Sequence, residues 1–345
     1  MPEGASRCAP ETPQSYYRAC EDIALRGTDP NAAILTTGGH GRDRRESNCP
    51  HRRRWIVAFG GLVLAMLMFG GYFVAGRHGA VAGLTSRDLV ALRYVLPGLV
   101  FVPLLLKWGG VRNLGGVGWM RGATLTLLGG APYAFLVMVG VQFAPGVHAT
   151  VITPGFTPIA GAILAHAMLG EPVTLRAIIG IPVALVGIVR VAGPGLWSVG
   201  PSVWLGDMMF AAASISYALY TVLLRRWQVP PLTAAAVINV LSAGIWLPVY
   251  AVLSDLQSLT AVPFGEIIGQ AVFQGVFTSV AALFLYVRAV HVLGASQTSF
   301  FFVLVPVFGT LLASIVLDER VSAVQGAGIA AVAVAMMLAT FRRRD

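Results

Sequence analysis

The stretch TPIAGAILAHAMLGEPV, Thr157 to Val173, decides the fold because the chain repeats it. A second stretch, VPVFGTLLASIVLDERV from Val305 to Val321, aligns with it without a gap at an offset of 148 residues. Matches of alanine or valine are expected by chance in so apolar a chain, but matches of proline, glycine and glutamate are not. The informative pairs are Pro158 with Pro306, Gly161 with Gly309, and Glu171 with Glu319.

The same offset relates much of the rest of the chain. It pairs Tyr72 with Tyr220, Arg77 with Arg225, Gly146 with Gly294, and Gly180 with Gly328. We therefore divide the chain into a tail, residues 1–54, and two similar halves, residues 55–197 and 200–345. Each half contains five apolar segments, and because five is odd the second half enters the membrane in the opposite direction.

The composition predicts a membrane protein. Of 345 residues, 56% are hydrophobic and 11% are charged, against about 25% charged residues in soluble domains. The net charge of +9 comes from basic residues at the ends of apolar segments, where they orient a membrane protein, so no nucleic-acid partner is expected. The cysteines, Cys8, Cys20 and Cys49, fit neither a disulfide framework nor a zinc pattern.

The tail is polar and has no apolar run long enough for a core or a membrane span. We expect residues 1–54 to be a disordered cytoplasmic tail. A basic segment followed by an apolar one is also missing, so the tail is not a secretory signal. A wrongly assigned start codon is an alternative origin for it.

The remaining sequence predicts an all-α polytopic membrane protein with ten transmembrane helices, arranged as two inverted five-helix repeats. A helix needs about 20 mostly apolar residues to cross the hydrocarbon layer. The predicted spans are residues 56–76, 87–106, 120–142, 147–168, 174–193, 204–224, 233–253, 266–288, 294–316 and 322–341.

The distribution of basic residues predicts the orientation. With the N-terminus in the cytoplasm, the inner segments hold thirteen arginine or lysine residues and the outer segments hold four. Cytoplasmic loops carry the excess of such residues. We therefore expect a multi-pass protein of the cell membrane (plasma or inner membrane), with both termini cytoplasmic.

The duplicated segment from Pro158 to Glu171, the sequence GDMMFAAASISYALYTVLLRR at the start of the second half, and Arg93 in the second span carry a family resemblance. The chain resembles the ten-helix EamA family of the drug/metabolite transporter superfamily over about residues 55 to 341. The resemblance implies a transporter of amino acids, metabolites or drugs, often working outward. The first span lacks the membrane-embedded glutamate of the superfamily's four-helix multidrug exporters, so antiport by that carboxylate is not expected.

Polar residues inside the spans are the candidates for substrate contacts. Polar side chains lose hydrogen-bond partners in hydrocarbon, so they line a cavity or a helix contact. The small hydroxyl residues favour helix contacts, and the larger polar residues favour the cavity. Arg93 either receives a carboxylate or phosphate of the substrate, or reaches the outer interface or helix carbonyls. The candidate substrate-binding residues are Tyr72, Arg93, Tyr133, Thr153, Tyr217, Tyr220, Gln274 and Gln297.

Three further pairs have two interpretations each. Pro158 and Pro306 each remove a helical hydrogen bond, which predicts matching kinks that act as hinges or merely shape a cavity. Glu171 and Glu319 are expected to cap the helix that follows each of them, rather than to couple ions. His148 and His166 are expected at the membrane interface, with proton coupling as the alternative.

The leading functional prediction is a secondary transporter of a small metabolite, such as an amino acid, that works by alternating access. The alternatives are a drug or nucleoside exporter, a nucleotide-sugar or phosphate-ester carrier, and an intramembrane enzyme. The sequence contains none of the usual catalytic motifs, so no enzyme is expected, and no metal or cofactor either. The expected partners are the lipid bilayer and a small-molecule substrate; a proton as coupling ion and a homodimer are left open.

Overall fold

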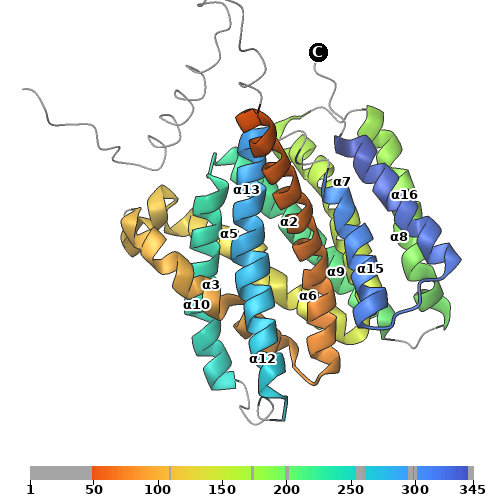
Figure 1. Ribbon diagram of the computed structural model, residues 1–345, viewed down its shortest axis with the longest axis horizontal. Helices are drawn as coiled ribbons and strands as arrows, with labels where there is room; N and C mark the ends of the chain where they lie inside the picture. Colours follow the sequence, from red (N-terminus) through yellow and green to blue (C-terminus); the bar gives the residue numbers. More distant parts are fainter. Residues whose placement is uncertain are drawn as a thin grey trace, which may run out of the picture.

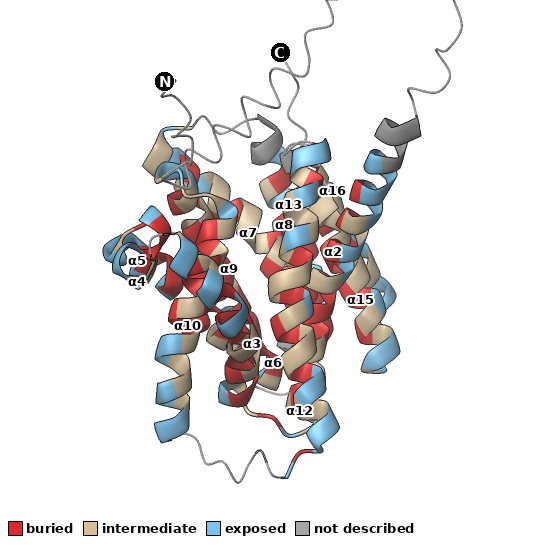
Figure 2. Cartoon of the chain, turned by 60° about the vertical axis from the view of Figure 1, so that its left-hand side comes forward, coloured by how far each residue is buried: buried red, intermediate tan, exposed pale blue. Residues whose placement is uncertain are grey.

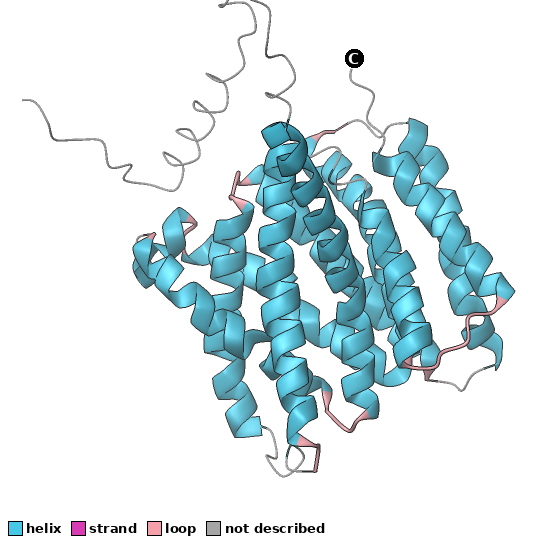
Figure 3. Cartoon of the chain, in the orientation of Figure 1, coloured by secondary structure: helices cyan, strands magenta, loops and turns pink. Residues whose placement is uncertain are grey.

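A computed structural model of the chain describes residues 49–108, 110–171, 175–198, 202–253, 259, 261–293, 298 and 301–340. Within these residues every regular element is a helix (Figure 3). Seven described helices are long and apolar enough to cross a membrane, and three shorter apolar helices accompany them. All ten fall on predicted spans, so the protein is an all-α polytopic membrane protein. The predicted tail up to residue 48, and Gln297, lie outside the described residues.

Figure 1 shows the helices as one bundle, with the start of the first described helix and the end of the last at the same end. The first half contains α2 (Cys49–Val81), α3 (Ser86–Lys107), α4 (Gly110–Asn113), η1 (Leu114–Gly116), α5 (Trp119–Gly129), α6 (Ala131–Phe143), α7 (Gly146–Leu169) and α8 (Leu175–Ser198). The second half contains α9 (Val203–Arg226), α10 (Pro231–Leu253), α12 (Phe264–Gln270), η2 (Ala271–Ala281), α13 (Ala282–Leu293), η3 (Phe301–Val303), α15 (Leu304–Val316) and α16 (Ala323–Thr340).

The contacts between the halves occur in equivalent pairs. Helix α2 packs on α15 and α13, and its counterpart α9 packs on α7 and α6. Helix α3 packs on its own counterpart α10, as α8 does on α16. Contacts that repeat in this way are those of an inverted repeat, in which a pseudo-two-fold axis exchanges the halves.

Glycine allows the closest of these approaches. A Cβ atom on Gly70 of α2 would lie 2.8 Å from the backbone nitrogen of Gly309 in α15. A Cβ atom on Gly187 of α8 would lie 2.7 Å from the carbonyl oxygen of Gly328 in α16. Small residues let membrane helices pack backbone against backbone, where lipid offers no competing hydrophobic force.

The side chains that face outward are apolar as well. Figure 2 shows buried residues along the inner faces of the helices and many exposed residues on the outer faces. Large apolar side chains such as Leu99, Ile163 and Ile315 are among the exposed ones. A water-exposed surface of this kind would be unfavourable, so these faces are the ones that contact the bilayer.

The third predicted span is broken. The predicted span over residues 120–142 is confirmed as an apolar span over Trp119–Phe143, but it is not one continuous helix, because α5 ends at Gly129 and α6 begins at Ala131. Between them Gly130 has φ −99° and ψ −140°, outside the helical region. Pro132 lies in the first turn of α6, where proline favours a helix start. Gly129 and Gly130 therefore mark a break in the helix, as well as a place where helices approach closely.

The two glutamates differ from expectation in what they bind. Glu319 accepts hydrogen bonds from the backbone amides of Gly146 (2.8 Å) and Val147 (3.0 Å), so it caps α7 of the other half. Its own following helix, α16, is capped already, because Ser322 and Gln325 bond to each other's backbone amides. Glu171 forms an exposed ion pair with Arg225.

Replacing Glu319 with alanine should lower the melting temperature of the purified protein. The change removes two charge-assisted hydrogen bonds from the first turn of α7, and loss of a helix cap costs about 0.5 to 2 kcal/mol. Glu171→Ala is the matched control, since an exposed ion pair contributes about 0 to 1 kcal/mol. Equal melting temperatures for the two variants would contradict the capping role.

Candidate functional site

Arg93 lies in the interior of the bundle without a counter-ion. Its guanidinium carbon is 4.2 Å from the centre of the Tyr72 ring and 5.7 Å from that of Tyr94. Its Nη1 donates a hydrogen bond to Thr278 Oγ1 at 3.2 Å, and its Nε is buried without a hydrogen-bond partner. No carboxylate in the described part of the chain pairs with Arg93. A half-buried arginine whose Nε is buried without a partner has unused capacity for an anion.

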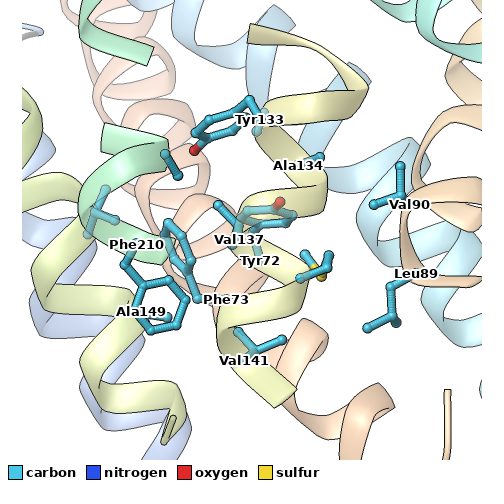
Figure 4. Close-up of a cluster of buried hydrophobic side chains, with 14 of the residues drawn as sticks. Tyr72, Phe73, Leu89, Val90, Tyr133, Ala134, Val137, Val141, Ala149 and Phe210 are labelled. Atoms are coloured by element: carbon cyan, nitrogen blue, oxygen red, sulfur yellow. The ribbon is translucent and has the colours of Figure 1, made fainter. Parts of the chain in front are cut away.

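A row of tyrosine rings lies beside Arg93. The ring centres of Tyr133 and Tyr217 are 5.2 Å apart, as are those of Tyr217 and Tyr220. Figure 4 shows Tyr133 at one end of the buried apolar cluster and Tyr72 within it, near Val137. The predicted residues Tyr72, Arg93, Tyr133, Tyr217 and Tyr220 therefore form one group.

Tyr217 is the most exposed ring of this group, with 37% of its surface accessible. Its ring packs between those of Tyr133 on α6 and Tyr220 on α9. Tyr217 therefore offers the most accessible aromatic surface beside Arg93.

Gln274 joins the group through the irregular helix η2, which is a π-helix. The side chain is fully buried, and its Nε2 donates to Gln270 Oε1 at 2.6 Å. Its Oε1 has no partner. Thr278, which accepts from Arg93, donates to the Gln274 carbonyl oxygen at 2.5 Å. π-Helical segments are frequent at functional sites.

The polar contacts of the site repeat in the two halves. Ser242 Oγ accepts from the amide of Ala131 at 3.0 Å, next to the break at Gly130. The 148-residue offset relates Ser242 to Tyr94, and Gly130 to Thr278. The equivalent contact in the other direction is the hydrogen bond from Arg93, next to Tyr94, to Thr278. In each case the second helix of one half contacts the irregular third helix of the other half. We call Tyr72, Arg93, Tyr94, Tyr133, Tyr217, Tyr220, Gln274 and Thr278 the central cluster.

The break in the third span lies next to this cluster. Tyr220 packs against Gly129, since a Cβ atom there would lie 2.9 Å from the tyrosine ring. Gly129 is the last residue of α5, and α6 carries Tyr133 in its first turn, so the break between α5 and α6 lies beside the tyrosines. Half-helix ends of this kind stabilise anionic groups of a ligand inside a membrane.

Other predicted residues lie at the edge of the site. Thr153 is buried, with no partner for its Oγ1, and its carbonyl oxygen accepts from Ser214 of α9 at 3.2 Å. Pro158 lies within α7, one turn after Pro154. Pro306 lies near the start of α15, which continues directly from η3.

Sequence reasoning missed several features. Tyr94 and Ser242 were not selected, although the offset that pairs them was a usable signal. His148 lies in the first turn of α7, near the end of the span, but it is buried against the protein and its Nδ1 lies 2.9 Å from Asp207 Oδ1. His166 is exposed, and its Nδ1 contacts the carbonyl oxygen of Glu171 at 2.8 Å.

Two irregular third helices beside a half-buried arginine, at the meeting of inverted halves, define a class of protein: membrane transporters built from inverted repeats. The EamA-like transporter family matches residues 55–192 and again 204–341. The chain belongs to the EamA-like transporter family.

Individual proteins agree with this assignment. The chain is 29% identical over 220 residues to the uncharacterized transporter YyaM of Bacillus subtilis (strain 168), covering 63% of this chain and 71% of YyaM. It is 25% identical over 292 residues to an uncharacterized transporter of Archaeoglobus fulgidus, covering 80% and 95% of the two chains. One protein of known crystal structure shares the fold, with a TM-score of 0.56 and 18% identity, covering 84% of this chain and 96% of the other.

Proposed function

We propose that this transporter exports a small amphipathic metabolite of the amino acid type across the cell membrane by alternating access. The observation that supports this most is the unpaired Nε of Arg93 among the tyrosine rings. Both termini are assigned to the cytoplasm, on the excess of basic residues in the segments of that side.

The unpartnered atoms of the cluster match a zwitterion. Arg93 Nε is a donor for a carboxylate. Gln274 Oε1 is an acceptor for an ammonium group. The rings of Tyr133 and Tyr217 offer an apolar face for a side chain and a π-surface for a cation.

Alternating access requires that the halves move against each other. Helix α7 of the first half packs on α9 of the second, and the prolines within α7, Pro154 and Pro158, remove two helical hydrogen bonds from it. We assign the bending of α7 to this segment. Pro306 would contribute at the start of α15 instead of its middle.

A phosphate-ester or nucleotide-sugar carrier is less compatible with the site. Diphosphates are bound by several arginine or lysine residues, and Arg93 is the one cation of the central cluster. A single cation suits a monocarboxylate. Drug and nucleoside export remain outcomes of the ligand screen described next.

Ligand screening of the purified protein tests the proposal. A ligand that binds only the folded state raises the melting temperature, so amino acids, nucleosides and cationic drugs are compared at equal concentration. We expect stabilisation by an amino acid, and flux of the same compound through reconstituted vesicles. Stabilisation by a nucleoside or drug instead, or no flux of any stabilising compound, would refute the amino acid assignment.

Tyr133→Ala and Gln274→Ala are both expected to abolish transport while the protein is still produced in normal amounts. The first removes a ring that faces Tyr217, and the second removes the unpaired acceptor. Gln228→Ala, in the exposed segment after α9, is the control. Normal transport by both cluster variants, measured as uptake into vesicles, would show that the central cluster is not the substrate site.

A further inference from the structure

A histidine and an aspartate form a buried pair between the halves, apart from the central cluster. His148 Nδ1 lies 2.9 Å from Asp207 Oδ1, and the two side chains are 2% and 8% exposed. Asp207 Oδ2 is buried and has no hydrogen-bond partner. A buried carboxylate oxygen without a partner is costly, and a buried ionisable residue of a membrane segment indicates function before stability.

The pair lies between the helices that also carry the central site. His148 is in the first turn of α7, and Asp207 is near the start of α9. Gly206 brings the helices together, since a Cβ atom there would lie 2.6 Å from the Cβ atom of Ala144. Thr153 and Ser214, which are hydrogen-bonded to each other, are the next contact along these two helices towards Tyr217. The pair and the cluster are therefore linked through one helix contact.

Few other charges face the pair. Glu319 binds the amides of Gly146 and Val147 just before His148, and Arg77, adjacent to Gly146, donates to the carbonyl oxygens of Val141 and Gln142. These two charges are opposite and offset each other. The described parts of α6, α15 and α16 carry no charged side chain. The other charged groups at this end of the bundle include Arg87, Arg190, Asp318, Arg320 and the His78–Glu266 pair. Those at the far ends of α2, α5 and α9 are Arg54, Arg121, Arg225 and Arg226.

We propose that His148 and Asp207 form a proton-binding site and that the proton moves in the direction opposite to the substrate. This rests on the proposed transport function. With a neutral imidazole the pair carries one negative charge, and one proton taken from water makes it an imidazolium paired with a carboxylate, which is neutral overall. On binding, an O–H bond of hydronium breaks and an imidazole N–H bond forms, with water released; on proton release the same exchange runs in reverse.

The charge of the pair can control the packing of α7 on α9. A net charge in a low-dielectric contact is unfavourable, whereas a hydrogen-bonded neutral pair is tolerated there. Proton binding therefore favours close packing of the two helices at this end, and proton release favours their separation with entry of water. This end of the bundle is opposite the described start of α2 and the end of α16, so it is the predicted outer end, from which an inward proton gradient would supply the proton.

A substrate-free experiment tests proton binding. The melting temperatures of wild type, Asp207→Asn and His148→Gln are measured between about pH 5 and 8, where histidine changes charge. Stability depends on pH through the protons bound in each state, so we expect the difference between wild type and each variant to change across this range. A difference that stays constant would overturn the proposal.

A transport experiment tests coupling. Uptake of a mixture of radiolabelled amino acids into vesicles is measured with a pH gradient and, as exchange, without one. We expect the gradient to stimulate wild type and His166→Gln, whose histidine is exposed at the other end of α7, and stimulation to be lost in Asp207→Asn and His148→Gln. Exchange by wild type without any stimulation overturns the proton site and leaves the proposed function standing. Absence of exchange in wild type refutes the proposed function. The melting experiment then still tests whether His148 and Asp207 bind a proton.

Discussion

Arg93→Met should lose amino acid binding while the folded protein becomes no less stable. Truncating one partner of a buried, hydrogen-bonded charge pair costs about 2 to 5 kcal/mol, which corresponds to a loss of affinity between about 30-fold and a few thousand-fold. Arg93 has no carboxylate partner among the residues that the structure describes, so an apolar side chain of similar length removes a desolvation cost. The substitution should therefore lower the affinity for the amino acid, measured by calorimetry, without lowering the melting temperature.

The carboxylate contact can be isolated by comparing an amino acid with its amide. Wild type should prefer the acid, and Arg93→Met should bind both equally weakly. Arg87→Met serves as control, since Arg87 is an exposed arginine at the start of the same helix that donates to the Leu253 carbonyl oxygen. If the variant keeps the wild-type preference for the acid, Arg93 does not bind the substrate carboxylate.

Gly130→Ala should destabilise the protein and weaken binding together. The added Cβ would lie 2.4 Å from the carbonyl oxygen of Thr126 and 2.5 Å from Ser242 Oγ. The carbonyl belongs to the last turn of α5, so it cannot move unless the break itself changes shape. Overpacking of this kind costs about 1 to 3 kcal/mol, and the shift would displace the α6 end that carries Tyr133.

Gly161→Ala is the matched control for this experiment. Gly161 is in the interior of α7, and an added Cβ atom meets nothing within 4 Å. Alanine is the better helix former by about 0.8 to 1.0 kcal/mol, so this variant should melt at the same temperature as wild type or higher. Equal behaviour of the two variants, followed by light scattering or dye fluorescence on heating, would mean that the break tolerates a side chain.

The helices could be predicted from the sequence because a membrane span is recognised by its length and its apolar composition alone. The repeat offset also led to the correct architecture, and helical spacing placed Tyr133 and Tyr217 on inward faces. Their contact with each other, with ring centres 5.2 Å apart, joins helices from different halves. Spacing along one helix identifies a face, but it does not identify which other helix that face meets.

The features that escaped prediction have the same physical origin. In a soluble protein the apolar face of a helix is the buried face, but in a bilayer the lipid-facing side is just as apolar. The sequence around His148 therefore did not distinguish interface from interior, and its partner Asp207 is 59 residues away in the chain. Glu319 was predicted to cap α16, but it caps α7 instead. The start of α16 is capped by Ser322 and Gln325.

The cap on α7 has a consequence for biosynthesis. The first amides of α7 are bonded by a residue, Glu319, that the ribosome adds more than 170 residues later, and α8 packs mainly on α16 at the end of the chain. The first five spans therefore enter the membrane with an uncapped helix and a helix face that lacks its partner. The late-arriving second half completes both, so a chain that stops before Glu319 is expected to be held by membrane quality control and degraded.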